Sequence, residues 1–386
     1  MKRLSLVFAS IALVLLVVLW PRPGITNSGR ASVEWLPAQQ ADVSDGFARA
    51  MKPKPLKFPR DLGPHNEYQT EWWYYTGTLE TKEGREFGYQ LTFFRRGLTP
   101  ETETVENASD WRSNQIYFSH FTISDIENNA FYPHERFSRP SAQLAGAQAE
   151  PYRVWVENWQ AEAIAPGQVH LQADAEDVSL DLTLNETLPP VLQGDRGYSK
   201  KGTEPGNASY YYSIIQQQAQ GQLTVEGETF EVSGLTWKDH EYSTSVLSPG
   251  TVGWDWFSLQ MDDGSALMLF DLRKANGSFS EASSGTFISA DGKTTPISSE
   301  EEKIKVLSTW RSPVSNAAYP NQWHIEVPKI GLVLEGEPLM PNQELNVSNT
   351  YWEGAVGFEG KVSDRPIRAK GYIEMTGYAS SFDGLL

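Results

Sequence analysis

Four consecutive polar residues, Asp239, His240, Glu241 and Tyr242, stand inside a segment that is otherwise rich in aromatic and β-branched residues. Side chains of a β-strand alternate between its two faces, so an extended chain turns His240 and Tyr242 one way and Asp239 the other. An imidazole beside a phenol suits acid–base chemistry or hydrogen bonding to a ligand. We therefore take Asp239, His240 and Tyr242 as candidate catalytic residues.

A further acidic residue, Asp271, lies in the otherwise apolar stretch LMLFDLR (267–273). Burial would raise the pKa of its carboxyl group, and an acid with a raised pKa can donate protons near neutral pH. The structural alternative is an ion pair of Asp271 with Arg273 or with His240. We keep both interpretations and add Asp271 to the candidate catalytic set.

Aromatic residues make up 12% of the chain and include 13 Trp. Trp and Tyr in such numbers suit either large β cores or an apolar binding cavity. His120 is one candidate for lining such a cavity, and its structural alternative is a buried histidine that is hydrogen-bonded to a neighbour. The residues that would line a cavity, unless they serve as core, are Trp72, Trp73, Tyr75, His120, Tyr211, Trp237, Trp254 and Trp256.

These residues lie on runs that have the pattern of β-strands joined by tight turns. Three pairs of runs read as hairpins: 67–81 with 85–97, 253–261 with 265–274, and 286–290 with 293–297. Other strand-like runs are 114–125, 151–164, 169–184, 209–237, 322–328, 351–362 and 370–378. After residue 57 there is no long apolar stripe of helical period, so the pattern predicts an all-β sandwich or barrel.

The first two hairpins share paired aromatic residues, an acidic-glycine turn and a closing arginine, Arg95 or Arg273. This repetition indicates an internal duplication. A single hydrophobic core stops growing beyond about 250–300 residues. We therefore predict two β-domains, over residues 58–243 and 244–386.

The chain begins with Met-Lys-Arg, and residues 4–20 (LSLVFASIALVLLVVLW) carry no charge. Such a segment falls between the apolar core of a signal peptide, about 7–15 residues, and a membrane span, about 17–25. We predict a signal peptide or anchor helix at 1–20, with a retained anchor slightly favoured, and a proline-containing linker at 21–57. The basic residues Lys2 and Arg3 should stay on the cytoplasmic side of the membrane. The folded part would then be periplasmic or otherwise extracytoplasmic, either secreted or tethered to the inner membrane.

Composition excludes several classes of function. The net charge is −17 and there is no Cys. An acidic surface repels phosphate backbones, so we expect no nucleic-acid partner. Without cysteine there are no disulfides or thiolate ligands, and HExxH, P-loop and GxSxG motifs are also absent. We expect no cofactor and no metal, and a metal site built from residues far apart in the sequence is the open alternative.

Several segments together resemble the carotenoid 1,2-hydratase / AttH-like family over roughly residues 55–380. They are EWWYYTG (71–77) preceded by His65, GYQLTFFR (88–95), QIYFSHFTISD (115–125), GNASYYYS (206–213), GLTWKDHEYS (234–243), GWDWFSLQMDDGSALMLFDLR (253–273), SPVSNAAYPNQWHIEVP (312–328) and YWEGAV…GYIEMTGY (351–378). The resemblance implies two consecutive lipocalin-like antiparallel β-barrel domains. It also implies that His240, Tyr242 and Asp271 are the catalytic positions of the hydratases, with Leu269 where some relatives carry Tyr.

Two functions follow as alternatives. We favour an exported protein that binds an apolar small molecule such as a lipid, polyene or isoprenoid. The resemblance also implies an ABC transporter as partner. The alternative is a hydratase or cyclase that adds water across an isolated C=C by acid catalysis. The export segment opposes a carotenoid hydratase, because such an enzyme would act on the cytoplasmic side. Convergence of His240, Tyr242 and Asp271 within hydrogen-bond reach would favour the enzyme.

Overall fold

The computed structural model describes residues 46–100, 113–244 and 247–381. The predicted signal or anchor at 1–20, and the linker up to residue 45, lie outside the described residues. Within the three described ranges, no helix is long and apolar enough to cross a membrane. The described chain is all-β apart from the short 3-10 helices η1 (Arg60–Leu62), η2 (Ser141–Gln143) and η3 (Pro328–Ile330).

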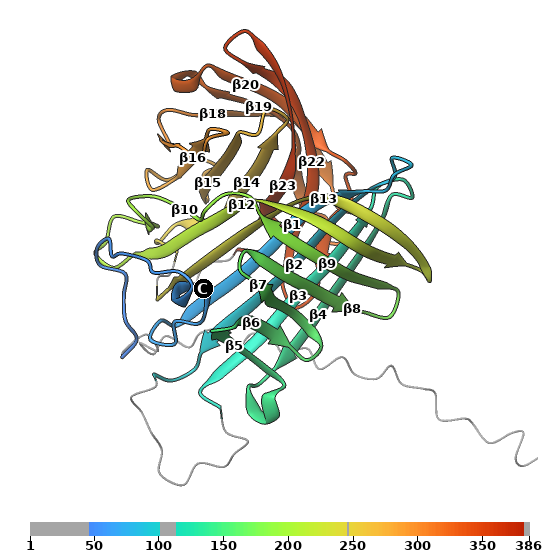
Figure 1. Cartoon of the computed structure of the whole chain (residues 1–386). Helices are drawn as coiled ribbons and strands as arrows, with labels where there is room; N and C mark the ends of the chain where they lie inside the picture. Colours follow the sequence, from blue (N-terminus) through green and yellow to red (C-terminus); the bar gives the residue numbers. More distant parts are fainter. Residues whose placement is uncertain (1–45, 101–112, 245–246, 382–386) are drawn as a thin grey trace, which may run out of the picture. The chain divides into compact units, whose positions relative to one another are not determined.

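The first sheet has 13 strands (Figure 1). They are β1 (Thr70–Glu80), β2 (Glu86–Gly97), β3 (Gln115–Asp125), β4 (Ala130–Ser138), β5 (Ala145–Ala149), β6 (Tyr152–Val156), β7 (Trp159–Ala165), β8 (Gln168–Asp174), β9 (Val178–Glu186), β10 (Val191–Leu192), β11 (Tyr198–Lys200), β12 (Ala208–Val225) and β13 (Glu228–Ser243). The order is β4-β3-β2-β1-β13-β12-β9-β8-β7-β6-β5, with β10 and β11 paired to β12. Contacts of β6 with β2, β3 and β4 bring the two edges together, so this barrel is nearly closed.

The second sheet has 10 strands and forms a half-barrel. They are β14 (Thr251–Met261), β15 (Ala266–Lys274), β16 (Ser284–Ile288), β17 (Thr294–Ser298), β18 (Lys303–Arg311), β19 (Ala318–Val327), β20 (Leu332–Pro338), β21 (Glu344–Asn346), β22 (Thr350–Val362) and β23 (Arg365–Met375). The order is β17-β16-β15-β14-β23-β22-β20-β19-β18, with β21 paired to β22. In both sheets the first strand pairs with the last, β1 with β13 and β14 with β23.

The prediction of an all-β chain with two antiparallel barrel-like sheets is confirmed. All three predicted hairpins form, as β1–β2, β14–β15 and β16–β17. The run at 151–164 is two strands, because a turn at Glu157 with φ 57° divides it. Both sheets belong to one compact unit, and the boundary between domains after residue 243 stays a prediction.

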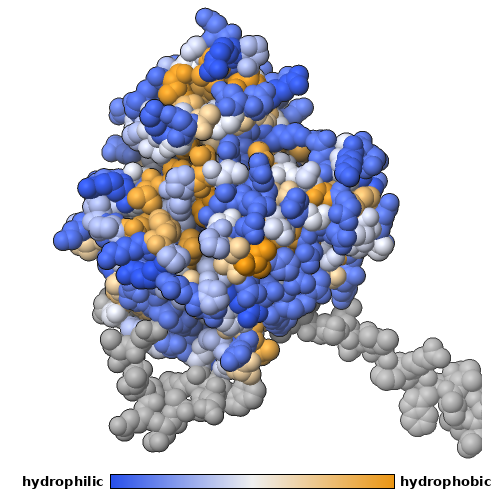
Figure 2. Space-filling model, viewed as in Figure 1, coloured by the Kyte–Doolittle hydropathy of each residue, from blue (hydrophilic) through white to orange (hydrophobic). Residues whose placement is uncertain are grey.

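Alternation of side chains gives each sheet two different faces. The inner face of each sheet builds its own core, with Trp73 and Tyr75 in the first and Phe257 and Leu259 in the second. The opposite faces meet in a third cluster, the inter-sheet layer, which we define as the residues of both sheets that pack between them, among them Tyr74, Tyr211, Trp237, Trp256, Met268 and Tyr372. The face of the molecule in Figure 2 is mainly hydrophilic, with hydrophobic residues near the top of the view and across its middle.

Candidate functional site

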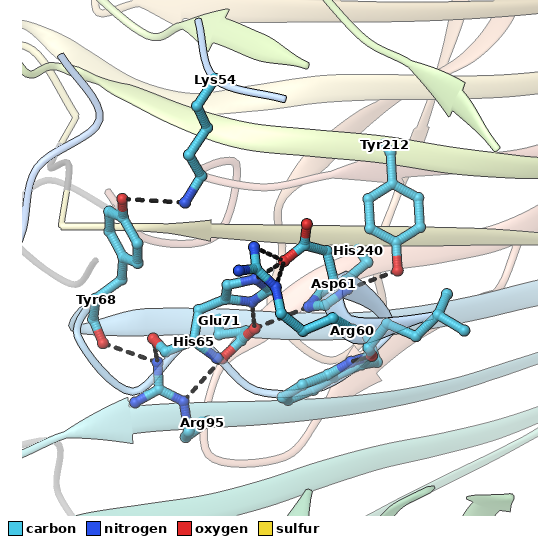
Figure 3. A network of polar contacts seen from close by, with 11 residues as sticks. Lys54, Arg60, Asp61, His65, Tyr68, Glu71, Arg95, Tyr212 and His240 are labelled. Carbon is cyan, nitrogen blue, oxygen red and sulfur yellow. Dashed lines mark hydrogen bonds and ion pairs between the residues drawn. The ribbon is translucent and has the colours of Figure 1, made fainter. Parts of the chain in front are cut away.

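His240 lies on the inner face of β13, beside the buried carboxylate of Glu71 (Figure 3). Tyr242 lies on the same face, two residues further along the strand. His65 Nδ1 and His240 Nε2 each lie 2.8 Å from Glu71 Oε1. Arg95 Nε donates to Glu71 Oε2 at 3.0 Å. The four residues come from the chain after η1, from β1, from β2 and from β13, so the fold assembles them across long stretches of sequence.

Each member of this network is held by a further partner. His65 Nε2 lies 3.1 Å from Asp61 Oδ1, and the Tyr212 hydroxyl lies 2.8 Å from His240 Nδ1. The Tyr242 ring stacks on the His65 ring with 3.6 Å between centroids and 8° between planes. The two catalytic candidates on this face are therefore neighbours, with 5.8 Å between the His240 and Tyr242 ring centroids.

The charges of this network are matched. Burial alone would raise the pKa of Glu71, but the Arg95 charge and the hydrogen bonds from His240 and His65 hold it well below its ordinary value. Burial lowers the pKa of His240 to about 4, although Glu71 opposes the shift. Glu71 is therefore a carboxylate and His240 a neutral imidazole at pH 7. The buried Glu71 charge is thus compensated by Arg95 and hydrogen-bonded by both histidines, although one guanidinium nitrogen of Arg95 has no hydrogen-bond partner among the described residues.

His65, Glu71 and His240 are also a set that could hold a metal ion, because one donor atom from each lies within 4.8 Å of the others. Two histidines and a carboxylate suit Zn²⁺ or Fe²⁺. The same three atoms already satisfy one another's hydrogen bonds, and Arg95 places a positive charge beside them. In this structure the three residues are joined as a hydrogen-bond network.

Asp271 does not join His240 and Tyr242, so the convergence that would favour the enzyme does not occur. Asp271 lies on the inner face of the second sheet, opposite Asp255, and is 1% exposed. Neither predicted structural pairing forms, because Arg273 pairs with Asp255 and His240 pairs with Glu71. Burial and the neighbouring Glu302 carboxyl raise the pKa of Asp271 well above its ordinary value.

Asp239 points to the other side of β13, into the inter-sheet layer. Its carboxyl accepts hydrogen bonds from the Ser213 hydroxyl at 2.5 Å, the Tyr211 hydroxyl at 2.6 Å and Trp237 Nε1 at 2.7 Å. Trp256 Nε1, from the second sheet, donates to the Tyr211 hydroxyl at 3.1 Å. Burial raises the pKa of Asp239 to about 7, although the three hydrogen bonds oppose it.

Two more carboxyl groups lie in this layer that sequence reasoning missed. Glu353 on β22 accepts a hydrogen bond from Tyr74 of the first sheet. Burial raises the pKa of Glu374 to about 8, and burial with the charge of Glu374 raises the pKa of Glu353 well above its ordinary value. Both stand in aromatic strand segments, YWEGAV and GYIEMTGY, so the argument that selected Asp271 could have selected them too.

The predicted ligand-binding residues divide between the core of the first sheet and the inter-sheet layer. Trp73 and Tyr75 belong to the core of the first sheet. Trp72, Tyr211, Trp237, Trp254 and Trp256 belong to the inter-sheet layer. His120 bridges the sheets as well, because its Nδ1 lies 2.6 Å from the Tyr351 hydroxyl and its Nε2 lies 2.9 Å from Glu135. It is a buried, hydrogen-bonded histidine, as its structural alternative predicts.

A cleft of about 650 Å³ opens between the sheets at one end of this layer. Thr78 lies four residues beyond Tyr74 on β1, and Leu235 lies two residues before Trp237 on β13, so cleft and layer share the same strand faces. The cleft is lined by Thr78, Leu79, Glu80, Thr81, Lys82, Ser233, Gly234, Leu235, Gln260, Met261, Asp262, Arg368, Ala369 and Lys370. Its volume is within the range of about 300–1,000 Å³ that is usual for small-molecule sites.

The sequence matches the AttH-like family over residues 49–378, and the chain belongs to that family. A protein of Nitrosomonas europaea assigned to AttH, known from its crystal structure, is 34% identical with a TM-score of 0.76, covering 86% of this chain and 100% of that one. Kievitone hydratase from Nectria haematococca shares the fold, with 15% identity, a TM-score of 0.65, and 88% and 99% of the two chains covered. Curated protein sequences gave no significant match.

Proposed function

We propose that this AttH-like protein binds an elongated apolar molecule, of lipid, polyene or isoprenoid type, between its two sheets. The observation that carries the proposal is the cleft of about 650 Å³ at the end of the inter-sheet layer. The apolar side chains that line it are Leu79, Leu235, Met261 and Ala369. Its polar end would meet the charged rim of the cleft, where Lys82, Arg368 and Lys370 lie.

Binding is favoured over the hydration chemistry that the family resemblance implies. That chemistry needs an acid next to the group that positions water. Asp271 and His240 face the interiors of different sheets, and His240 is engaged with Glu71 and Tyr212. The positions implied to be catalytic therefore do not form one site in this protein.

A second candidate function, acid-catalysed hydration or cyclisation of an alkene, is favoured by Asp239. This carboxyl, with its pKa near 7, lies among aromatic rings of both sheets. Its O–H would add a proton to the C=C bond, water would add to the cation, and that water would return a proton to the carboxylate. Aromatic faces stabilise such a cation. Kievitone hydratase, whose name states a hydration, has the same fold.

Residues 4–20 extend the proposal to location and partners. An uncharged segment behind Met-Lys-Arg would export the protein and tether it to the inner membrane, or be cleaved after export. The protein would then exchange its ligand with that membrane or with an ABC transporter in it. Detection of the full-length chain in the cytosol of its host, and none outside it, would contradict this part.

The test is native mass spectrometry of protein purified from its own host. Wild type should carry an apolar molecule, and Leu235→Trp, which fills the cleft, should lose it. Thr229→Trp, at an exposed position of β13 away from the cleft, is the matched control and should keep the ligand. No apolar molecule on wild type, together with no binding to a panel of lipids and polyenes, would overturn the proposal.

A further inference from the structure

The inside of the first sheet contains a buried amide without a hydrogen-bond partner and, near it, a buried ammonium. Gln217 is 0% exposed, and both polar atoms of its amide have no hydrogen-bond partner among the described residues. Lys238 is 1% exposed, and the charge of Glu186 favours its protonated form. Buried polar groups are paired in nearly all folds, and orphaned ones point to a missing water or ion.

Lys238 and Gln217 are neighbours on the inner face. Lys238 stands opposite Tyr75 of β1, and Thr236, two residues before it on the same face, stands opposite Gln217 of β12. Gln217 is therefore diagonal to Lys238 across the β12–β13 pair, next to a register shift between Ile214 and Gln217. Diagonal neighbours across a sheet are within reach of long side chains.

Two tyrosines complete the surroundings of the ammonium. The Nζ atom of Lys238 lies 4.2 Å from the Tyr152 ring centroid and 5.4 Å from that of Tyr75. The two tyrosine hydroxyls lie 2.7 Å apart. Burial lowers the pKa of Lys238 to about 8, so the amine still carries a proton at neutral pH. The set thus offers a positive charge and several N–H and O–H donors inside an apolar barrel.

We propose that the interior of the first sheet holds a carboxylate group, bound by the Lys238 ammonium and the Gln217 amide N–H beside the Tyr75 and Tyr152 hydroxyls. A carboxylate has the charge and the acceptor oxygens that these donors lack. A metal cation would be repelled by the ammonium. This site is independent of the inter-sheet cleft, because Lys238 and Asp239 point to opposite faces of β13.

The decisive variant is Gln217→Glu, which is nearly isosteric and supplies a carboxylate of its own. Sodium acetate and sodium decanoate, compared with sodium chloride at equal ionic strength, should raise the Tm of dialysed wild type by about 3 °C or more. A response to acetate alone identifies a small metabolite anion, and a stronger response to decanoate identifies a fatty acid. Gln217→Glu, which places a second carboxylate opposite Glu186 of β9, should no longer respond to either anion.

Gln218→Glu is the matched control, because this substitution adds the same charge at an exposed position of the same strand. It should leave the response to both anions unchanged. If Gln217→Glu does not fold, an NMR titration with ¹³C-labelled acetate tests the proposal instead. Acetate is added to wild type and to Lys238→Met, and only wild type should bind it. No Tm response of wild type to either anion, or a crystal structure grown in acetate with water alone beside Lys238, would overturn the proposal.

Discussion

Asp239 and His240 are adjacent in sequence, yet β13 carries them into opposite surroundings. On the His240 side, Glu71 meets Arg95 and two histidines, so its charge is matched and the carboxylate stays ionised. On the Asp239 side, the carboxyls of Asp239, Glu353 and Glu374 are hydrogen-bonded by neutral donors and have raised pKa values. Paired buried charges hold their residues in one arrangement, whereas carboxyl groups with raised pKa values among aromatic rings suit contact with an apolar ligand.

Glu71→Gln should have the largest effect, because it leaves Arg95 buried without its counter-ion and removes one of the two carboxylates that contact His65. Breaking a buried pair costs about 3–5 kcal/mol. We expect this loss in the free energy of unfolding, measured by urea denaturation at pH 7. Glu135→Gln is the control. The Glu135 carboxylate is hydrogen-bonded to His120 and to the Ser348 backbone N–H, and its loss should lower the free energy of unfolding by less. Equal losses in the free energy of unfolding for Glu71→Gln and Glu135→Gln would contradict a special role for the Glu71 network.

Glu374→Gln should act with the opposite sign and stabilise the protein at pH 7 by about 1–3 kcal/mol. The native Glu374 holds its proton up to a pKa of about 8, whereas the unfolded chain releases it near pH 4.5. Folding therefore takes up a proton between these values, and wild-type stability falls as pH rises from about 4.5 to 8. Urea denaturation from pH 5 to 8 should show the variant gaining on wild type, and a constant difference would refute the raised pKa.

Asp239→Asn separates the two candidate functions. The amide preserves the shape of the side chain, so the affinity for an apolar ligand should change by less than about fivefold, or roughly 1 kcal/mol. If the protein hydrates its ligand, turnover should fall by about 100-fold or more, because the proton donor is gone. Ligand affinity and product formation are measured on the same preparation. Full turnover by the variant would exclude Asp239 as the acid.

Asp271→Asn should have the smallest effect on binding, under about twofold, because Asp271 faces the interior of the second sheet and not the inter-sheet layer. Isothermal titration with the ligand that co-purifies with wild type measures it. A large loss of affinity, with the fold intact by circular dichroism, would show that the ligand reaches the half-barrel.

Local pattern predicted much of the fold. Alternation over 239–242 assigned His240 and Tyr242 to one face and Asp239 to the other, and the contacts of these side chains agree. Turn residues located the three hairpins. Pattern could not predict which face would meet the other sheet, since that depends on strands far apart in the chain.

The candidate site was only partly accessible from the sequence, for the same reason. Pairing of His240 with Glu71, and of Tyr74 with Glu353, joins residues separated by 169 and 279 positions. No local signal carries such contacts. The family resemblance grouped Asp271 with His240, and the structure places these two residues on the inner faces of different sheets.

Photo-crosslinking tests the central claim most directly. A diazirine-bearing fatty acid is bound to wild type and to Leu235→Trp, irradiated, and mapped by peptide mass spectrometry. Wild type should be labelled on cleft and inter-sheet residues of both sheets, such as Thr78, Leu235 and Met261, and the variant should lose those labels. Labels confined to residues outside the cleft, or unchanged in the variant, would contradict binding between the sheets.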